Sequence, residues 1–123
     1  MLEGLTKTYK AGGTVSPSRF VKFDGNGDIV QAAAATDSII GVSQRGITAN
    51  SGERIDVIKS GIAEVEFGGN VTRGGQVTSD ASGKAVAAAP ATGVNNRVGG
   101  IAEDSAVSGD IVDVHIVMGS VQG

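Results

Sequence analysis

The sequence predicts an all-β fold, either a small β-barrel or a β-sandwich, with little or no helix. Three observations lead to this prediction. Apolar residues alternate with other residues in several short runs, which is the pattern of half-buried strands. Turn signals that contain glycine separate these runs. The chain also matches itself after about 56 residues, so we expect two copies of one unit.

The alternating runs are rich in Val and Ile, which favour strands. They are FVKF at 20–23, the run that starts at Ile55, AEVEF at 63–67 and the run that starts at Val112. The segments between them include DGNG, NSGE, DASG and VSGD, where Gly stands beside Asp, Asn or Ser. Each copy is therefore expected to contain four or five short strands.

QAAAATD, residues 31–37, is a segment that could form a helical turn, because Ala favours helix. Its counterpart in the second copy contains Pro90, which does not fit a helix interior. We therefore expect an extended or loop conformation for both segments.

Identical residues recur at an offset of 56 over a large part of the chain. The matched pairs include Gly12 and Gly68, Asp24 and Asp80, Gly27 and Gly83, and Val30 and Val86. After a longer loop in the second copy the offset becomes 57, where SGERIDV at 51–57 matches SGDIVDV at 108–114. We interpret residues 12–66 and 68–121 as the two copies, with residues 1–11 as an N-terminal arm.

Residues 12–123 are expected to form a single all-β domain from the two copies. Two units with so little core apiece gain from closing together, because closure removes exposed strand edges. The expected result is one barrel, or two facing sheets related by a pseudo-twofold axis. A solenoid is less favoured, because it normally needs three or more repeats.

Composition excludes several kinds of partner. The chain has 20 Gly and only four aromatic residues, so its core gains little per residue and is expected to need a partner or self-association. The formal net charge is −3 and the basic residues are scattered, which argues against nucleic acid. No apolar run approaches the roughly 18 residues that cross a bilayer, so no membrane partner is expected. The chain has no Cys and therefore no thiolate site.

DGNGDIV, residues 24–30, resembles the middle of a calcium-binding loop, but its outer positions do not fit. With Gly27 at loop position 6, position 1 is Lys22 and position 12 is Ala33, where a calcium loop needs carboxylates. The second copy reads DASGKAV and keeps only the Asp, the Gly and the final Val. These residues suit a hairpin turn, so Asp24, Gly27, Asp80 and Gly83 are predicted turn residues and no metal is predicted.

No catalytic group emerges from the remaining polar residues. Asp56 and Asp113 are matched acids, but each lies in an alternating strand and is expected to point outward, where it could contact basic residues of a partner. His115 is the single histidine, so a His-based metal site or a triad has little support. We predict neither catalysis nor a cofactor.

The chain resembles the small capsid decoration, or cement, proteins of tailed bacteriophages. The resemblance rests on SGERIDVIKSGIAEVEF, on a V-T-x-G-G-x-V-T-S-D-x-x-G-K-A segment, on a Gly-Gly-Ile-Ala step and on the late SGDIVDVHIV strand, all within residues 38–118. It implies a virion protein, made in the host cytoplasm, that binds the outside of the capsid. Its implied partner is the major capsid protein, whose subunits it would bridge, often as a homotrimer.

The segment MLEGLTKTYKA lies outside the predicted repeats and supplies a candidate capsid-contact arm, with Leu2, Leu5 and Tyr9 as its contact residues. We expect this arm to become ordered on binding. Two other classes of function stay open: a different structural assembly protein, such as a tail or fibre component, and a ligand-binding β-barrel.

Overall fold

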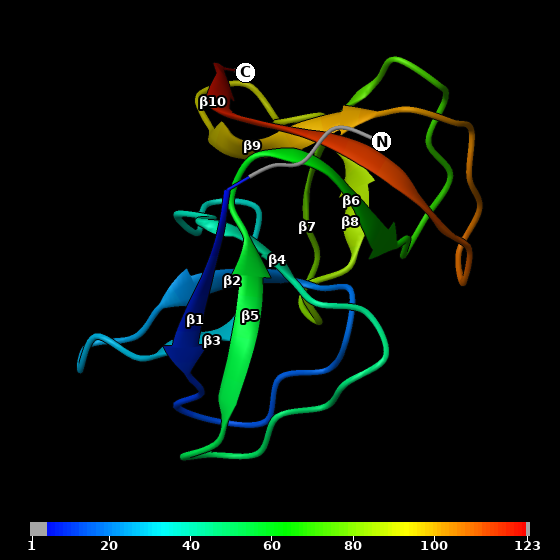
Figure 1. The fold of residues 1–123 in the computed structure, drawn as a ribbon. Coiled ribbons are helices and arrows are strands. Elements are labelled where there is room, and N and C mark those ends of the chain that lie inside the picture. Colours follow the sequence, from blue (N-terminus) through cyan, green and yellow to red (C-terminus); the bar gives the residue numbers. More distant parts are fainter. Residues whose placement is uncertain (1–4, 123) are drawn as a thin grey trace.

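The computed structural model describes residues 5–122, which form ten β-strands in two five-stranded antiparallel sheets (Figure 1). No helix occurs among these residues, so this part of the chain offers none that could cross a membrane. The prediction of an all-β fold is confirmed, and QAAAATD continues from a strand into a loop, as expected.

The first sheet has the strand order β1-β5-β4-β2-β3. Its strands are β1 (Thr6–Lys10), β2 (Phe20–Phe23), β3 (Ile29–Gln31), β4 (Gly41–Ser43) and β5 (Arg54–Ile58). The second sheet has the order β6-β10-β9-β7-β8. Its strands are β6 (Gly61–Glu66), β7 (Gln76–Ser79), β8 (Ala85–Ala87), β9 (Asn95–Ala102) and β10 (Ile111–Gln122).

The two sheets have the same topology, because each strand of the second follows its counterpart in the first by five places in the element order. Turn conformations repeat as well. The counterparts Gly27 and Gly83 both have a positive φ, of 83° and 76°. The counterparts Ser18 and Gly74 do as well, with values of 57° and 87°. This agreement is what a duplicated unit would produce.

Each sheet curls until the residue after its first strand meets its last strand. Ala11 forms a single parallel bridge with Ile29, and Phe67 forms the corresponding bridge with Ala85. One bridge does not close a barrel. The structure therefore contains two strongly curled sheets packed together, with no closed barrel.

The sheets divide the chain between Ile58 and Gly61, whereas the predicted copies meet at residue 67. β1 pairs with β5 throughout, from Thr6 opposite Ile58 to Lys10 opposite Arg54. Residues 6–10, which the sequence suggested as part of an arm, are thus a strand of the first sheet. These residues are therefore part of the fold of the first unit and not a separate segment in front of it.

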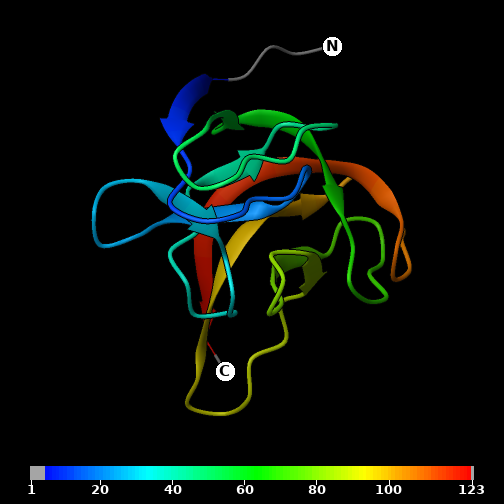
Figure 2. The ribbon, with the colours of Figure 1, turned by 90° about the horizontal axis from the view of Figure 1, so that it is seen from below.

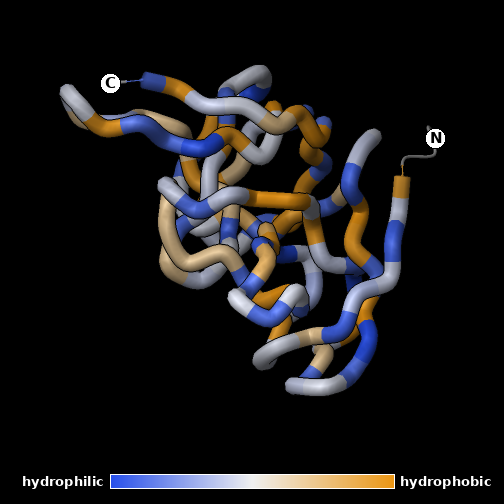
Figure 3. The backbone as a smooth tube through the Cα atoms, turned by 90° about the vertical axis from the view of Figure 1, so that its left-hand side faces the viewer, coloured by the Kyte–Doolittle hydropathy of each residue, from blue (hydrophilic) through white to orange (hydrophobic). Residues whose placement is uncertain are grey.

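The core consists of two clusters of buried side chains, most of them aliphatic. One lies within the first sheet and includes Tyr9, Ile29 and Ile55. The other belongs mainly to the second sheet, but it also takes in Phe20 and Val42 from the first. Hydrophobic segments of the backbone gather inside the molecule, while the projecting turns are largely hydrophilic (Figure 3). Because one cluster includes side chains from both sheets, the junction between the sheets is itself part of the core.

Candidate interaction surfaces

The β2–β3 and β7–β8 hairpins contain the predicted turn residues. The carboxylate of Asp24 accepts the amide hydrogens of Asn26 and Asp28 at 2.8 and 3.0 Å. Asp80 does the same for Ser82 and Lys84 at 2.8 and 2.9 Å. In each turn a glycine with positive φ follows three residues after the Asp, which is the conformation that glycine adopts without steric cost.

The same two carboxylates explain why the copies share a Gly-Gly pair. A Cβ atom on Gly12 would collide with the carboxylate of Asp24, and one on Gly68 would collide with that of Asp80. Only glycine lets the first turn of each unit approach its hairpin so closely. No group of three or more His, Cys, Asp or Glu suited to a metal ion occurs in the described part of the chain.

The two hairpins differ in their surroundings. Gly83 is buried, its carbonyl accepts the amide of Phe20 at 2.8 Å, and a Cβ on it would approach the Phe20 carbonyl to 2.9 Å. Gly27 is exposed, with nothing near the position of a Cβ. The β2–β3 hairpin projects away from the sheets, whereas the β7–β8 hairpin lies against the first sheet (Figures 1 and 2).

This difference overturns the expected pseudo-twofold axis. A twofold contact is self-complementary, so Gly27 would have to rest on the counterpart of Phe20, which is Gln76. Instead Gln76 and Gly27 are both exposed. The two units therefore meet head to tail, through different faces.

Phe20 is the largest apolar side chain at this junction and is fully buried. Its ring lies against Gly99 in β9, where a Cβ atom would come within 2.6 Å of the ring. Two main-chain hydrogen bonds also cross the junction: the Glu66 amide donates to the Ser18 carbonyl at 3.0 Å, and the Arg97 amide donates to the Ala35 carbonyl at 2.7 Å. Apolar packing and backbone hydrogen bonds thus hold the units together.

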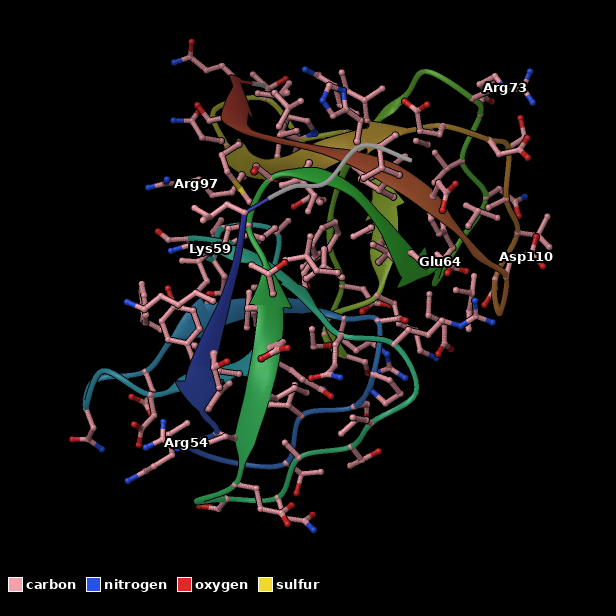
Figure 4. All side chains as sticks on the ribbon, viewed as in Figure 1. Arg54, Lys59, Glu64, Arg73, Arg97 and Asp110 are labelled. Atoms are coloured by element: carbon pink, nitrogen blue, oxygen red, sulfur yellow. The ribbon has the colours of Figure 1, made fainter. Side chains whose placement is uncertain are left out.

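A group of charges surrounds this contact. The Glu66 carboxylate forms salt bridges with Arg19 of the first unit and with Lys84 of its own unit, both with N–O distances of 3.2 Å. Burial by itself raises the pKa of Glu66, but the two cations outweigh it and hold the pKa below its ordinary value. Glu64, on the side of β6 that faces the first sheet, receives Arg45 at 2.7 Å (Figure 4).

The N-terminal contact residues that the sequence suggested have different positions. Leu2 lies outside the described residues. Leu5 is 62% exposed, which leaves its side chain free to meet a partner. Tyr9 is buried in the first sheet, stacks edge-on against Phe23 at 5.5 Å and accepts a hydrogen bond from Lys59 at 2.7 Å. Of the two described residues, Leu5 is the one that a partner can reach.

The end of the second sheet extends beyond the junction as a two-stranded ribbon of β9 and β10. After an irregularity between Ile116 and Gly119, β10 keeps pairing with β9 as far as Gln122. Val117 and Met118 are 40% and 42% exposed there. A hollow of about 310 Å³ lies between this ribbon and the first unit, and its lining includes Ile39, Arg97 and Met118. The ribbon and the hollow form an exposed, partly apolar surface.

The matched acids and the histidine lie on strands. Asp56 is half-buried and accepts the Thr8 hydroxyl at 2.6 Å across β1 and β5. Asp113 and His115 are exposed on β10. Neither the hollow nor the junction charges could be predicted from the sequence, because both need residues that the fold brings together from different units.

An all-β chain with two curled sheets, projecting hairpins and no assembled catalytic group among its described residues is typical of a structural protein that acts through its surfaces. Comparison with known families narrows this class. The chain matches the family of the XM1 gp53 minor capsid protein over residues 3–116, and it belongs to that family. It is therefore a structural, capsid-associated phage protein and not an enzyme.

A solved structure shares this fold. The chain is similar to the head fiber gp8.5 N base of bacteriophage phi29, with a TM-score of 0.69 and 21% sequence identity, over 97% of this chain and 98% of that chain. At this identity the likeness concerns the fold. No curated protein matches the chain.

Proposed function

We propose that the protein decorates the outer surface of a phage capsid and stabilises the shell by bridging neighbouring major capsid protein subunits. Membership of a minor capsid protein family carries this proposal. The surface of the molecule supports it, because several large apolar side chains are exposed. They include Leu5, Phe23, Val117 and Met118.

Decoration does not need one strong site. Many weak contacts repeated over a symmetric shell produce avidity, and a small, Gly-rich subunit with few aromatic residues gains additional burial at such contacts. A homotrimer at local threefold positions would place three copies of each contact on the shell. We propose this oligomer as the form that binds.

Two surfaces are candidates for the capsid contact. The first is the segment around Leu5, which precedes β1 and is exposed. The second is the ribbon with Val117 and Met118, which lies beside the hollow at the junction of the units. Each combines exposed apolar side chains with nearby charge, the composition expected of an interaction surface.

The direct test is co-sedimentation with expanded heads of the same phage that were assembled without this protein, followed by imaging of the added density. We expect saturable binding at regular positions between capsid subunits and a higher temperature of shell disruption. Binding without any gain in shell stability would contradict the bridging function.

Two variants locate the contact. Leu5→Asp and Met118→Asp each place a charge on one candidate surface without touching the core, and the variant at the true contact should lower head binding at least tenfold. Ile47→Asp serves as a matched control, because Ile47 is 46% exposed in a turn on neither surface. Equal binding by all three variants would exclude both surfaces.

A second candidate is a role as the base of a fibre attached to the head. The fold shared with a head fiber base favours this alternative. A fibre base is expected to bind heads and to recruit a separate fibre protein, with little effect on shell stability. Imaging of purified virions decides between the two functions, since only a fibre base would show a filament extending from the density.

A further inference from the structure

One edge of β10 has no partner strand over its last part. β6 pairs with β10 only as far as Ile116, which stands opposite Gly61. On the other side of β10 the pairing with β9 continues to Gln122. No other main-chain hydrogen bond from the described residues reaches residues 117–122. This part of β10, called the open edge here, therefore offers N–H and C=O groups to a further strand.

The corresponding edge in the first unit is covered. β1 pairs with β5 along its whole length, and the Leu5 carbonyl accepts the amide of Lys59 just beyond the end of β5 at 2.7 Å. β5 ends at Ile58, whereas its counterpart β10 runs on to Gln122. The open edge is therefore an addition to the second unit that the repeated fold does not cover.

The sequence of the open edge does not protect it. Exposed edges are commonly blocked by charged side chains or by Pro, and IVMGSVQ at 116–122 contains neither. The irregularity in β10 lies at the beginning of the edge, so residues 119–122 pair regularly with β9. Val117 and Met118 add two exposed apolar side chains. These properties suit the addition of an extended strand from a partner.

Arg97 indicates the charge of that strand. It stands directly opposite Ser120 in the ribbon, is exposed, and forms no salt bridge with a described residue. Because Ser120 is short and neighbouring strands lie about 4.8 Å apart, the Arg97 side chain can extend over it to a strand at the open edge. The hollow beside Arg97 is also lined by Ile39 and Met118. An acid with apolar neighbours would fit this surface.

The segment MLEGL, residues 1–5, has this composition. An antiparallel register with Glu3 opposite Ser120 places Leu5 opposite Met118 and Leu2 opposite Val121. Residues 3 and 5 then share one face, because alternate residues of a strand point the same way. Glu3 would stand within reach of the cation, and Leu5, which is 62% exposed, would meet an exposed apolar side chain.

The geometry around Leu5 indicates that the segment comes from a second copy. Its carbonyl accepts the Lys59 amide and its amide donates to the Ser60 hydroxyl at 2.8 Å, so the chain reaches Leu5 from the side of β6. β6 is antiparallel to β10, and its residues after Gly61 pair with β10 before Ile116. The chain before Leu5 is thus directed away from the open edge of its own copy.

We propose that residues 1–5 of one copy add as an antiparallel strand to the open edge of β10 in a second copy. Each copy donates one segment and receives one, so the contact is heterologous and builds a ring if the rotation closes and a filament if it does not. A ring of three copies would produce the trimer of the proposed function. The contact is inferred from the chain alone and does not depend on capsid binding.

Disulfide formation tests this register, because the chain has no Cys. Leu2→Cys and Val121→Cys are made as two separate proteins, one of them with a tag that changes its mass. After mixing and mild oxidation we expect mainly the mixed dimer, since these two thiols meet across the contact and two identical ones do not.

His115→Cys in place of Val121→Cys is the matched control. His115 is also exposed on β10, but it lies where β6 covers the edge, opposite Ile62. It should give little mixed dimer with Leu2→Cys. Equal yields of mixed dimer with the two β10 variants, or no mixed dimer with either, would overturn the proposal.

Charge exchange gives an independent readout in sedimentation velocity without heads. Glu3→Arg and Arg97→Glu should each weaken self-association a few-fold, and the double variant should restore it, because the two charges attract across the contact. Arg54→Glu is the matched control, since Arg54 is exposed on the part of the first unit away from Arg97 (Figure 4). It should leave self-association unchanged.

Two results would refute the contact. One is a wild-type protein that stays monomeric at all concentrations, and the other is self-association that survives deletion of residues 1–4. If Arg97→Glu lowers head binding while the wild type is a monomer, a capsid strand occupies the open edge instead. That result would leave the proposed decoration standing and remove only this inference.

Discussion

At the scale of residues, the junction depends on a few positions where a large group meets a very small one. Phe20 and Gly99 are the clearest case, since the Phe20 ring occupies the space where any side chain of residue 99 would begin. In the same way, the carboxylates of Asp24 and Asp80 occupy the space where side chains of residues 12 and 68 would begin. These glycines are needed because another atom lies close, and not because the backbone is left-handed there.

Gly99→Ala should therefore destabilise the protein by about 1–3 kcal/mol, the usual cost of overpacking. Gly119→Ala is the matched control, because nothing lies near a Cβ at Gly119 in the next strand, and it should change stability by less than ~0.5 kcal/mol. Urea unfolding measures both. Adding Phe20→Leu to Gly99→Ala should cost less than the sum of the single changes, and simple additivity would argue against direct contact.

At the scale of elements, the two hairpins have the same internal structure but different roles. Asp24 and Asp80 each accept two backbone amides within the turn. Of the two hairpins, the β7–β8 hairpin is the one that binds the other unit. The Gly83 carbonyl accepts a hydrogen bond from the Phe20 amide, and the Ser82 carbonyl accepts one from the Arg19 guanidinium at 2.9 Å. One hairpin is a turn, and the other is a turn and a docking element.

Asp24→Ala should cost about 1 kcal/mol, because water can replace the lost carboxylate in the exposed turn. Asp80→Ala should cost more, about 2–3 kcal/mol, since loosening this turn also disturbs the buried contact with Phe20. Chemical denaturation compares the two variants, with Asp80→Asn as the control that keeps one acceptor oxygen. Equal costs at both positions would show that the hairpin does not support the junction.

At the scale of the whole molecule, carboxylates with lowered pKa values tie stability to pH. Burial raises the pKa of Asp37, but the Ala33 amide and Lys22 outweigh this effect and lower it from 3.8. Burial alone also raises the pKa of Glu66, but Lys84 and Arg19 outweigh this effect and lower it from 4.5. A lowered pKa in the folded state stabilises the fold above the unfolded pKa, and this stabilisation is lost as pH falls through the folded value.

Thermal unfolding should therefore show nearly constant stability from pH 7 to about 5, followed by a decline below pH 4.5. Glu66→Gln should be less stable at pH 7 and should decline less steeply in acid, so that its curve approaches the wild-type curve near pH 3. Glu103→Gln removes an exposed acid, is the matched control and should follow the wild type. Parallel curves for Glu66→Gln and the wild type would rule out this linkage.

Local properties of the chain predicted the strands and the turns, and matching the chain against itself predicted the duplication. The alternation of FVKF and the Asp-x-x-Gly turns depend on residues close together in sequence, so they could be recognised without a structure. The resemblance to phage decoration proteins indicated a phage virion protein, and the family match supports that class of protein.

The sequence by itself thus determined the all-β class, the repeated unit and its hairpin corners, because strand alternation and turn chemistry act over a few residues. Only the tertiary structure decided that β1 belongs to the first sheet, that Tyr9 is buried and that the units meet head to tail. These outcomes depend on which side chain fills which space between distant segments, such as Phe20 against Gly99. No local pattern in either copy records that pairing.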